Sequence, residues 1–175
     1  MIQMACNTDG PATNDGGEWF RRAFDQLYPL IYRHRDHASA AREITDLLTV
    51  LRPLGLPADA LTLDIACGAG RHLAAMRQSG LRAFGLDLSE ALLDRAVHES
   101  ALAGCVVRAD IRQLPFAGSF DLATNLFTSF GYFDSDRANL AALRQMVATL
   151  RSDGLLVMDH ANRARLEATL VPCDV

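Results

Sequence analysis

The sequence predicts an α/β fold in which helices cover both faces of a doubly wound, mostly parallel sheet. From residue 58 onward, short apolar stretches alternate with amphipathic stretches of helical period, which is the pattern of such a sheet. The first apolar stretch ends in small residues around Gly68 and Gly70, where a strand would turn into a helix. With 175 residues, of which 50% are hydrophobic and 22% are charged, the chain is long enough for one domain with a sizeable core.

Helices are predicted to precede the sheet, over residues 18–57. Residues 1–17 are polar, glycine-rich and without period, so we expect a flexible lead-in there. From Glu18 onward apolar residues recur at helical spacing, and Pro29 predicts a kink or a break in that helix. A second helix is expected at about 38–51, because prolines and glycines follow it directly.

Residues 58–175 are predicted to form the sheet domain. The expected strands lie at 61–66, 81–88, 105–110, 120–127 and 154–160, and the expected helices between them at about 70–79, 90–103 and 135–151. Ser89 is predicted to begin one of these helices, because its side chain can accept a hydrogen bond from the free amide of Leu92.

The composition argues against several kinds of partner. The net charge is −4 and no basic stripe offsets it, so we expect no nucleic-acid partner. The four cysteines are scattered, and His34 and His37 have no third ligand nearby, which predicts a reduced protein without a metal site. The sequence shows no signal pattern and no apolar run of membrane-spanning length, so we expect a cytoplasmic protein without a membrane partner.

Residues 61–73, LTLDIACGAGRHL, carry the clearest functional signal. In a doubly wound sheet, ligands bind beyond the carboxyl ends of the strands. Gly68 and Gly70 would let the chain turn sharply there and let a ligand approach the backbone. A dinucleotide site would have a third glycine where this chain has Leu73, so an NAD-dependent oxidoreductase is the weaker alternative.

The same stretch resembles the first motif of the class I S-adenosylmethionine-dependent methyltransferases. Asp64, Ala66, Gly68 and Gly70 match that motif, although the family usually has glycine where Ala66 stands. The resemblance implies S-adenosylmethionine as the cofactor and a Rossmann-like sheet of strand order 3-2-1-4-5. Asp64 would face the cationic methionine end of the cofactor. Arg71, which follows the glycines in similar enzymes, would help to hold the loop.

Acidic residues at the next two strand ends extend the resemblance. Asp87 stands 23 positions after Asp64, where a carboxylate can accept hydrogen bonds from both ribose hydroxyls. By resemblance, Leu88 would pack on the adenine. Asp110 would lie near the adenine amino group, and Ile111 would stack beside the ring.

Residues 125–133, NLFTSFGYF, bear on the acceptor. Family members that methylate amino groups of adenine or glutamine usually have Asn-Pro-Pro-Tyr where this chain has Asn-Leu-Phe-Thr. Those that methylate cytosine carbon need a Pro-Cys here, so both activities are disfavoured. The aromatic residues predict a wall for a small-molecule acceptor, although core packing explains each about as well: Phe127, Phe130, Tyr132 and Phe133. Asn125 is expected at the cofactor, and Tyr132 and His160 are the candidate proton acceptors.

The helices before the sheet resemble the lid of small-molecule methyltransferases. Tyr28, Tyr32 and Arg35 would close over the methionine end or over the acceptor. Methyl transfer from a sulfonium is an in-line displacement, for which positioning can suffice without a strong base. The alternative to an active enzyme is an inactive cofactor-binding module that acts through a partner chain.

The end of the chain departs from the family pattern. The resemblance covers about residues 18–160, and members normally add two antiparallel strands after the fifth. Only 15 residues follow His160, enough for a short helix at about 163–170, so the chain looks truncated and is expected to lack those last two strands. The fifth strand would then lie at the sheet edge. Because exposed apolar edges recruit other chains, we expect a homodimer through that edge or an unstable monomer.

Overall fold

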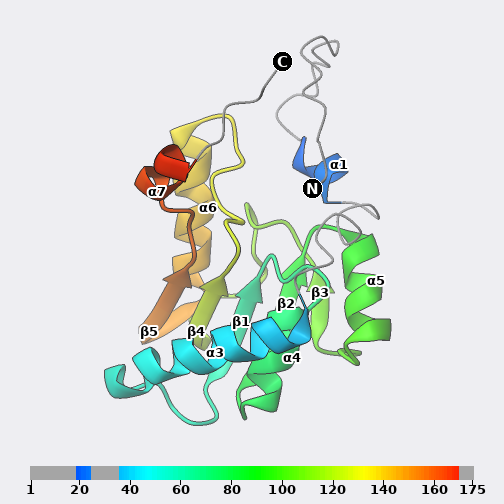
Figure 1. Cartoon of the computed structure of the whole chain (residues 1–175), viewed down its shortest axis with the longest axis vertical. Coiled ribbons are helices and arrows are strands. Elements are labelled where there is room, and N and C mark those ends of the chain that lie inside the picture. The colour runs from blue at the N-terminus through cyan, green and yellow to red at the C-terminus, as the bar shows by residue number, and fades with distance from the viewer. Residues whose placement is uncertain (1–18, 25–35, 170–175) are drawn as a thin grey trace.

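The sheet in the computed structural model has five parallel strands in the order β3-β2-β1-β4-β5 (Figure 1). The structure describes residues 19–24 and 36–169. Its strands are β1 (Leu61–Ile65), β2 (Arg82–Asp87), β3 (Val106–Arg108), β4 (Phe120–Asn125) and β5 (Leu150–Met158). Strand order reverses between β1 and β4, so the doubly wound sheet and the order predicted from sequence are confirmed.

Helices cover both faces of this sheet. The helices of the described residues are α1 (Phe20–Ala23), α3 (His37–Leu51), α4 (Arg71–Gln78), α5 (Glu90–Glu99), α6 (Asp136–Ala148) and α7 (Arg163–Thr169), with a 3-10 turn, η1 (Arg52–Leu54), after α3. One apolar core joins α3, α4 and α5 to one face, around Ile44 and Leu73. The other core lies on the opposite face, where Met146 of α6 joins Leu63 and Ile65 of β1. Figure 1 shows α3 and α4 together in front of the strands.

Short polar side chains start the two helices that border the functional end of the sheet. Asp36 precedes α3, and its Oδ1 accepts a hydrogen bond from the Ser39 amide at 2.7 Å. Ser89 precedes α5, and its Oγ accepts from the Leu92 amide at 3.3 Å. These contacts satisfy amides that the helices themselves leave free, and the Ser89 cap was predicted from sequence.

The boundary between α6 and β5 differs from the sequence-based expectation. The helix was expected to run to residue 151 and the strand to begin at 154, but β5 already begins at Leu150. The Ser-Asp-Gly sequence is typical of a turn. Here the strand absorbs it as an irregularity: the register with β4 shifts between Phe120 and Leu122, and Asp153 takes a φ of 66°.

The first predicted helix is described only in part. It was expected from Glu18 past Pro29, and the described portion is α1, with its four residues. The proposed lid residues Tyr28, Tyr32 and Arg35 lie outside the described residues.

β5 is the outermost strand of the described sheet and pairs with β4 alone. Its apolar residues from Leu155 to Met158 are only half-buried, whereas Leu122 and Ala123 of β4 are fully buried. Every residue of α7 is exposed, so that helix does not bury the strand.

Within the described ranges, no helix combines the length and the apolar character needed to cross a membrane.

Candidate functional site

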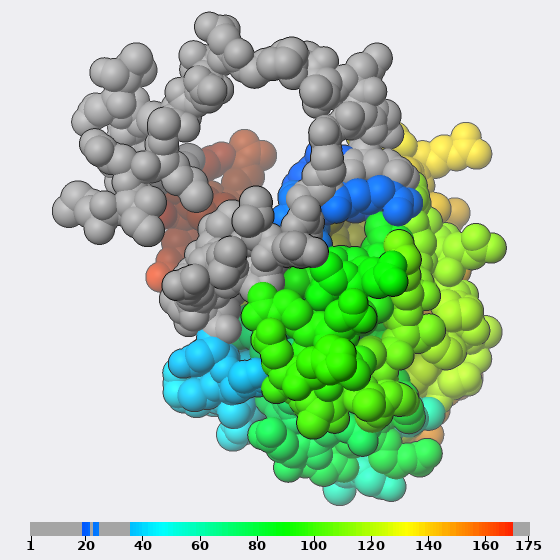
Figure 2. Space-filling model, turned by 90° about the vertical axis from the view of Figure 1, so that its right-hand side faces the viewer, coloured from blue at the N-terminus to red at the C-terminus, as the bar shows by residue number. Residues whose placement is uncertain are grey.

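A cavity of about 680 Å³ opens at the carboxyl ends of the strands. Its walls come from the loop after β1, from the end of β2 with the start of α5, and from the loops after β3 and β4. Phe20, Arg21 and Phe24 close one side. Figure 2 shows α1, in blue, resting on this end of the molecule. The cavity therefore lies where doubly wound sheets bind their ligands.

The loop between β1 and α4 turns through residues of positive φ: Ala66 at 61°, Gly68 at 55° and Gly70 at 78°. Ala66 and Gly68 line the cavity. Gly70 does not, because it faces α5: a Cβ there would lie 2.3 Å from Leu102 Cδ1 and 3.2 Å from Ala96 Cβ. Gly68 therefore borders the cavity, whereas the close approach at Gly70 is to neighbouring protein atoms.

Asp87 joins this loop to the end of β2. Its Oδ2 accepts a hydrogen bond from the Gly68 amide and its Oδ1 accepts from the Ser89 amide, each at 2.8 Å. The side chain is buried and lines the cavity. Burial raises the pKa of Asp87, although the two amides act in the opposite direction. The carboxylate therefore shapes the loop and borders the cavity at once.

Asp64 lies deeper, in β1. It is 2% exposed and lines the cavity. Its Oδ1 accepts a hydrogen bond from the Thr124 hydroxyl at 2.8 Å. Burial raises the pKa of Asp64 to about 7, so a cationic ligand in the cavity would favour its ionised form.

Asp110, Leu88 and Ile111 border the cavity beyond Asp87. The Asp110 carboxylate is already engaged, because Arg112 Nη2 donates to its Oδ2 at 2.6 Å and Arg112 Nε to its Oδ1 at 3.0 Å. The bonds from Arg112 lower the pKa of Asp110. Arg21 of α1 lies 4.0 Å from the same carboxylate. The sequence did not indicate either arginine as a partner of this acid.

An aromatic wall forms the remaining side of the cavity. Tyr132 stacks on Phe24, with ring centroids 5.6 Å apart, and meets the Trp19 ring edge-on at 5.0 Å. Phe20, which is 8% exposed, contacts Phe133 edge-on at 5.8 Å. The helical residues before the sheet and the loop after β4 thus share one aromatic cluster.

Residues 62–154 match a family model described as a methyltransferase domain, which is more than half of the chain. The chain belongs to the class I S-adenosylmethionine-dependent methyltransferases.

Several of the similar proteins are named as N-methyltransferases. The methyltransferase is 30% identical over 152 residues to the dTDP-3-amino-3,6-dideoxy-alpha-D-glucopyranose N,N-dimethyltransferase of Streptomyces fradiae, a match that covers 87% of this chain and 56% of that protein. It is 32% identical over 109 residues to the glycine/sarcosine N-methyltransferase of Parasynechococcus marenigrum, covering 59% of this chain and 39% of that protein.

Solved structures give the same relationship. CalS10 from Micromonospora echinaspora, an amino pentose methyltransferase solved with SAM bound, is 31% identical, with a TM-score of 0.62. That match covers 76% of this chain and 55% of CalS10. The chain therefore spans about 55% of the length of the first relatives that it matches.

Most of the residues predicted for the cofactor line the cavity of this methyltransferase: Asp64, Ala66, Gly68, Arg71, Asp87, Leu88, Asp110 and Ile111. Gly70, Asn125 and His160 are not among the lining residues. Asn125 is fully buried and its Nδ2 donates to the Ile65 carbonyl at 3.0 Å, so it links β4 to β1. His160 is exposed and faces the Phe130 ring, with centroids 6.3 Å apart.

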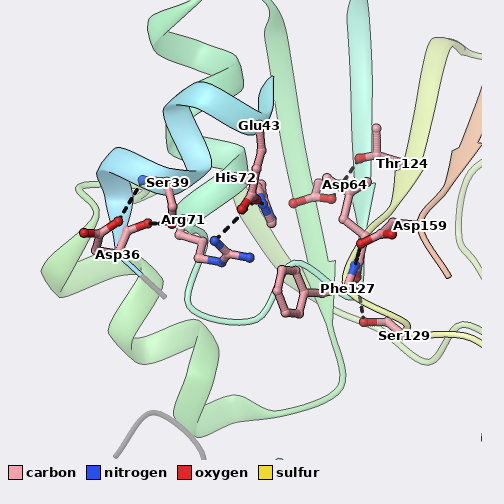
Figure 3. A network of polar contacts seen from close by, with 11 residues as sticks. Asp36, Ser39, Glu43, Asp64, Arg71, His72, Thr124, Phe127, Ser129 and Asp159 are labelled. Carbon is pink, nitrogen blue, oxygen red and sulfur yellow. Dashed lines mark hydrogen bonds and ion pairs between the residues drawn. The ribbon is translucent and has the colours of Figure 1, made fainter. Parts of the chain in front are cut away.

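Glu43 of α3 is a site neighbour that the sequence did not reveal. Its Oε2 lies 2.5 Å from His72 Nε2 and 3.5 Å from Arg71 Nη1 (Figure 3). The Arg71 guanidinium in turn lies over the Phe127 ring, 4.4 Å from its centroid. Burial lowers the pKa of His72. Nothing in the helical pattern of α3 distinguishes Glu43 from the other exposed residues of that helix. Only the folded structure shows that Glu43 lies beside Arg71 and His72.

Within the described part of the chain, no three His, Cys, Asp or Glu side chains gather as a metal site would require.

Proposed function

We propose that this methyltransferase binds S-adenosylmethionine in the cavity and transfers the methyl group to a small-molecule amine. The observation that carries the proposal is the placement of Asp64 and Asp87 beside one glycine-containing loop. Both carboxylates are buried and both line the same cavity. A ligand that brings positive charge and sugar hydroxyls would compensate the burial of both acids.

The lining residues suit the separate parts of this cofactor. Each oxygen of Asp87 accepts one amide bond and keeps a second lone pair, which a ribose hydroxyl can use. Leu88 and Ile111 offer apolar surface to the adenine beyond it. Asp64 would face the ammonium of the methionine end. Gly68 leaves room for the ligand against the backbone, because it carries no side chain.

When bound, the cofactor supplies a methyl group activated by a positively charged sulfur. The aromatic wall then excludes water and holds the acceptor amine in line with that methyl group, which is the main requirement of an in-line displacement. The Tyr132 hydroxyl can accept a hydrogen bond from the amine and so direct its lone pair. Tyr132 is the better of the two proposed proton acceptors, because it lines the cavity and His160 does not.

An amine acceptor is supported by two considerations. The named relatives methylate nitrogen, on amino sugars and on glycine or sarcosine. Methyl transfer also moves positive charge from the sulfur to the acceptor. Phe127 and Phe130 line the cavity, and aromatic faces stabilise a cation within about 6 Å.

A cofactor-binding module without activity is the second candidate. It is favoured by one observation, which is that His160, one of the two candidate proton acceptors, does not line the cavity. Methyl transfer from radiolabelled cofactor to a panel of small amines separates the two candidates, because the module would bind the cofactor and label nothing.

Asp87→Ala tests the cofactor site. The loss of a charged hydrogen-bond acceptor typically costs about 1.5–3 kcal/mol, so we expect S-adenosylhomocysteine to bind about 10- to 100-fold more weakly by calorimetry. Asp94→Ala, at an exposed position of α5, is the matched control and should bind normally. Unchanged affinity in the Asp87 variant would remove that residue from the site. Binding of NAD in place of S-adenosylhomocysteine would refute the proposed function.

A further inference from the structure

The loop after β4 passes through two consecutive residues in the left-handed region. Phe127 has a φ of 67° and Thr128 a φ of 58°. Residues with a side chain rarely adopt this conformation, and a β-branched residue such as threonine is a marked exception. Two such residues in succession persist only where their surroundings hold them.

Asp159, directly after β5, supplies that restraint. Its Oδ2 accepts a hydrogen bond from the Phe127 amide at 3.2 Å, and its carbonyl accepts from the Thr128 amide at 3.0 Å. Its own amide donates to the Asn125 carbonyl at 3.0 Å. One residue therefore engages both left-handed residues and the end of the strand that precedes them.

The restrained loop presents the Phe127 ring to the start of α4. The ring lies under the Arg71 guanidinium at 4.4 Å and 6.0 Å from the His72 ring, and all three side chains line the cavity (Figure 3). Arg71 is also near enough to Asp64 to act on its pKa. This is the end of the cavity where the methionine part of the cofactor is proposed to lie.

We propose that Asp159 is a positioning residue that sets the methionine end of the cavity through Phe127. It is not among the lining residues, so it acts on the ligand indirectly, through the loop and through its charge near His72. The inference rests on the proposed function for the identity and the direction of the ligand. Asp159 should therefore affect the binding of the methionine part of the cofactor and not the binding of the adenosine part at Asp87 and Asp110.

Two ligands of different length test this selectivity. S-adenosylhomocysteine reaches both ends of the cavity, whereas adenosine lacks the methionine part. Asp159→Ala removes the carboxylate that accepts from the Phe127 amide, so we expect a loss of about tenfold or more in S-adenosylhomocysteine affinity. Adenosine affinity should change less than about twofold, since Asp87 is untouched. Asp159→Asn keeps an acceptor oxygen and should restore most of the binding.

The control is Asp134→Ala, at an exposed position of the same connection between β4 and α6, which should bind both ligands normally. Urea unfolding of each variant reports whether the fold is retained. Equal losses for both ligands, or normal S-adenosylhomocysteine binding by Asp159→Ala, would overturn the role of Asp159. If the unaltered chain bound neither ligand, the proposed function itself would fail.

Discussion

The Asp64 carboxyl group is almost fully buried, and this makes the stability of the protein depend on pH. Burial raises its pKa from 3.8 to about 7, so the folded state holds a proton more tightly than the unfolded state does. The contribution of Asp64 to the free energy of unfolding must therefore fall as the pH rises from about 4 to about 7. Below that window both states are protonated, and the burial of Asp64 carries no charge penalty.

Asp64→Asn should remove this pH-dependent penalty. The amide keeps an oxygen for the Thr124 hydroxyl, so we expect the free energy of unfolding to rise by about 2–4 kcal/mol at pH 8 and to change little at pH 4. Urea unfolding at both pH values measures the difference, with Asp46→Asn, at an exposed position of α3, as the control. A gain of equal size at both pH values would contradict a titrating Asp64.

Single residues also show where sequence reasoning stops. Leu73 excluded a dinucleotide motif because that motif has a glycine there for close packing of the helix. In the structure, the room for the Leu73 side chain comes from Gly85 of β2, which has no side chain. A Cβ on Gly85 would lie 2.7 Å from Leu73 Cδ2 and 2.7 Å from Cys67 Sγ. The sequence of the loop alone could not show that a glycine on the neighbouring strand makes this room.

Among the secondary-structure elements, the strand ends were the most predictable part of the site. Asp64, Asp87 and Asp110 follow from sequence because parallel strands bring their carboxyl ends to one edge. The contacts of Glu43, Arg112 and Asp159 did not follow, since each joins elements or loops whose packing has no local pattern. The early start of β5 was missed for a related reason. The Ser-Asp-Gly sequence, which is typical of a turn, lies within an irregular edge strand.

Deleting residues 1–35 tests the predicted lid. The shortened chain loses the α1 aromatics that contact Tyr132 and Phe133 but keeps Asp36, which caps α3 through the Ser39 amide. We expect S-adenosylhomocysteine to bind at least about tenfold more weakly, because the cavity loses the wall formed by Phe20, Arg21 and Phe24, together with ring contacts worth about 0.5–1.5 kcal/mol each. Calorimetry measures the affinity.

The far-ultraviolet circular dichroism of the shortened chain should stay that of a folded α/β domain, since no residue of α1 belongs to either described core. Phe24→Ala in the full chain is the smaller companion variant and should show part of the loss. Normal binding by the shortened chain would show that α1 does not contribute to ligand binding.

At the scale of the whole molecule, the outer edge of β5 is the feature that most favours association with another chain. The Asp159 amide faces β4, and alternation along a strand then directs the amides of Leu156 and Met158 outward. Unpaired, half-buried apolar edges pair with other chains. We therefore predict a homodimer in which a second copy pairs along this edge.

Hydrogen exchange followed by NMR tests the edge without altering the chain. Protection of the Leu156 and Met158 amides should increase with protein concentration, in parallel with the mass from sedimentation. The amides of β4 serve as the internal control, because they already bond within the sheet and should not respond. A monomer at high concentration with unprotected outward amides would exclude this dimer.

The position of Asp159 at the end of β5 gives this edge a thermodynamic consequence. A chain paired along β5 restrains the strand that carries Asp159, and through it the Phe127 loop. Ligand binding and dimerisation are then thermodynamically linked. The factor by which dimerisation changes the affinity for the ligand equals the factor by which the ligand changes the affinity between the two copies. The dissociation constant of the predicted dimer would then depend on cavity occupancy, although the pairing edge lies at the opposite border of the sheet from β3.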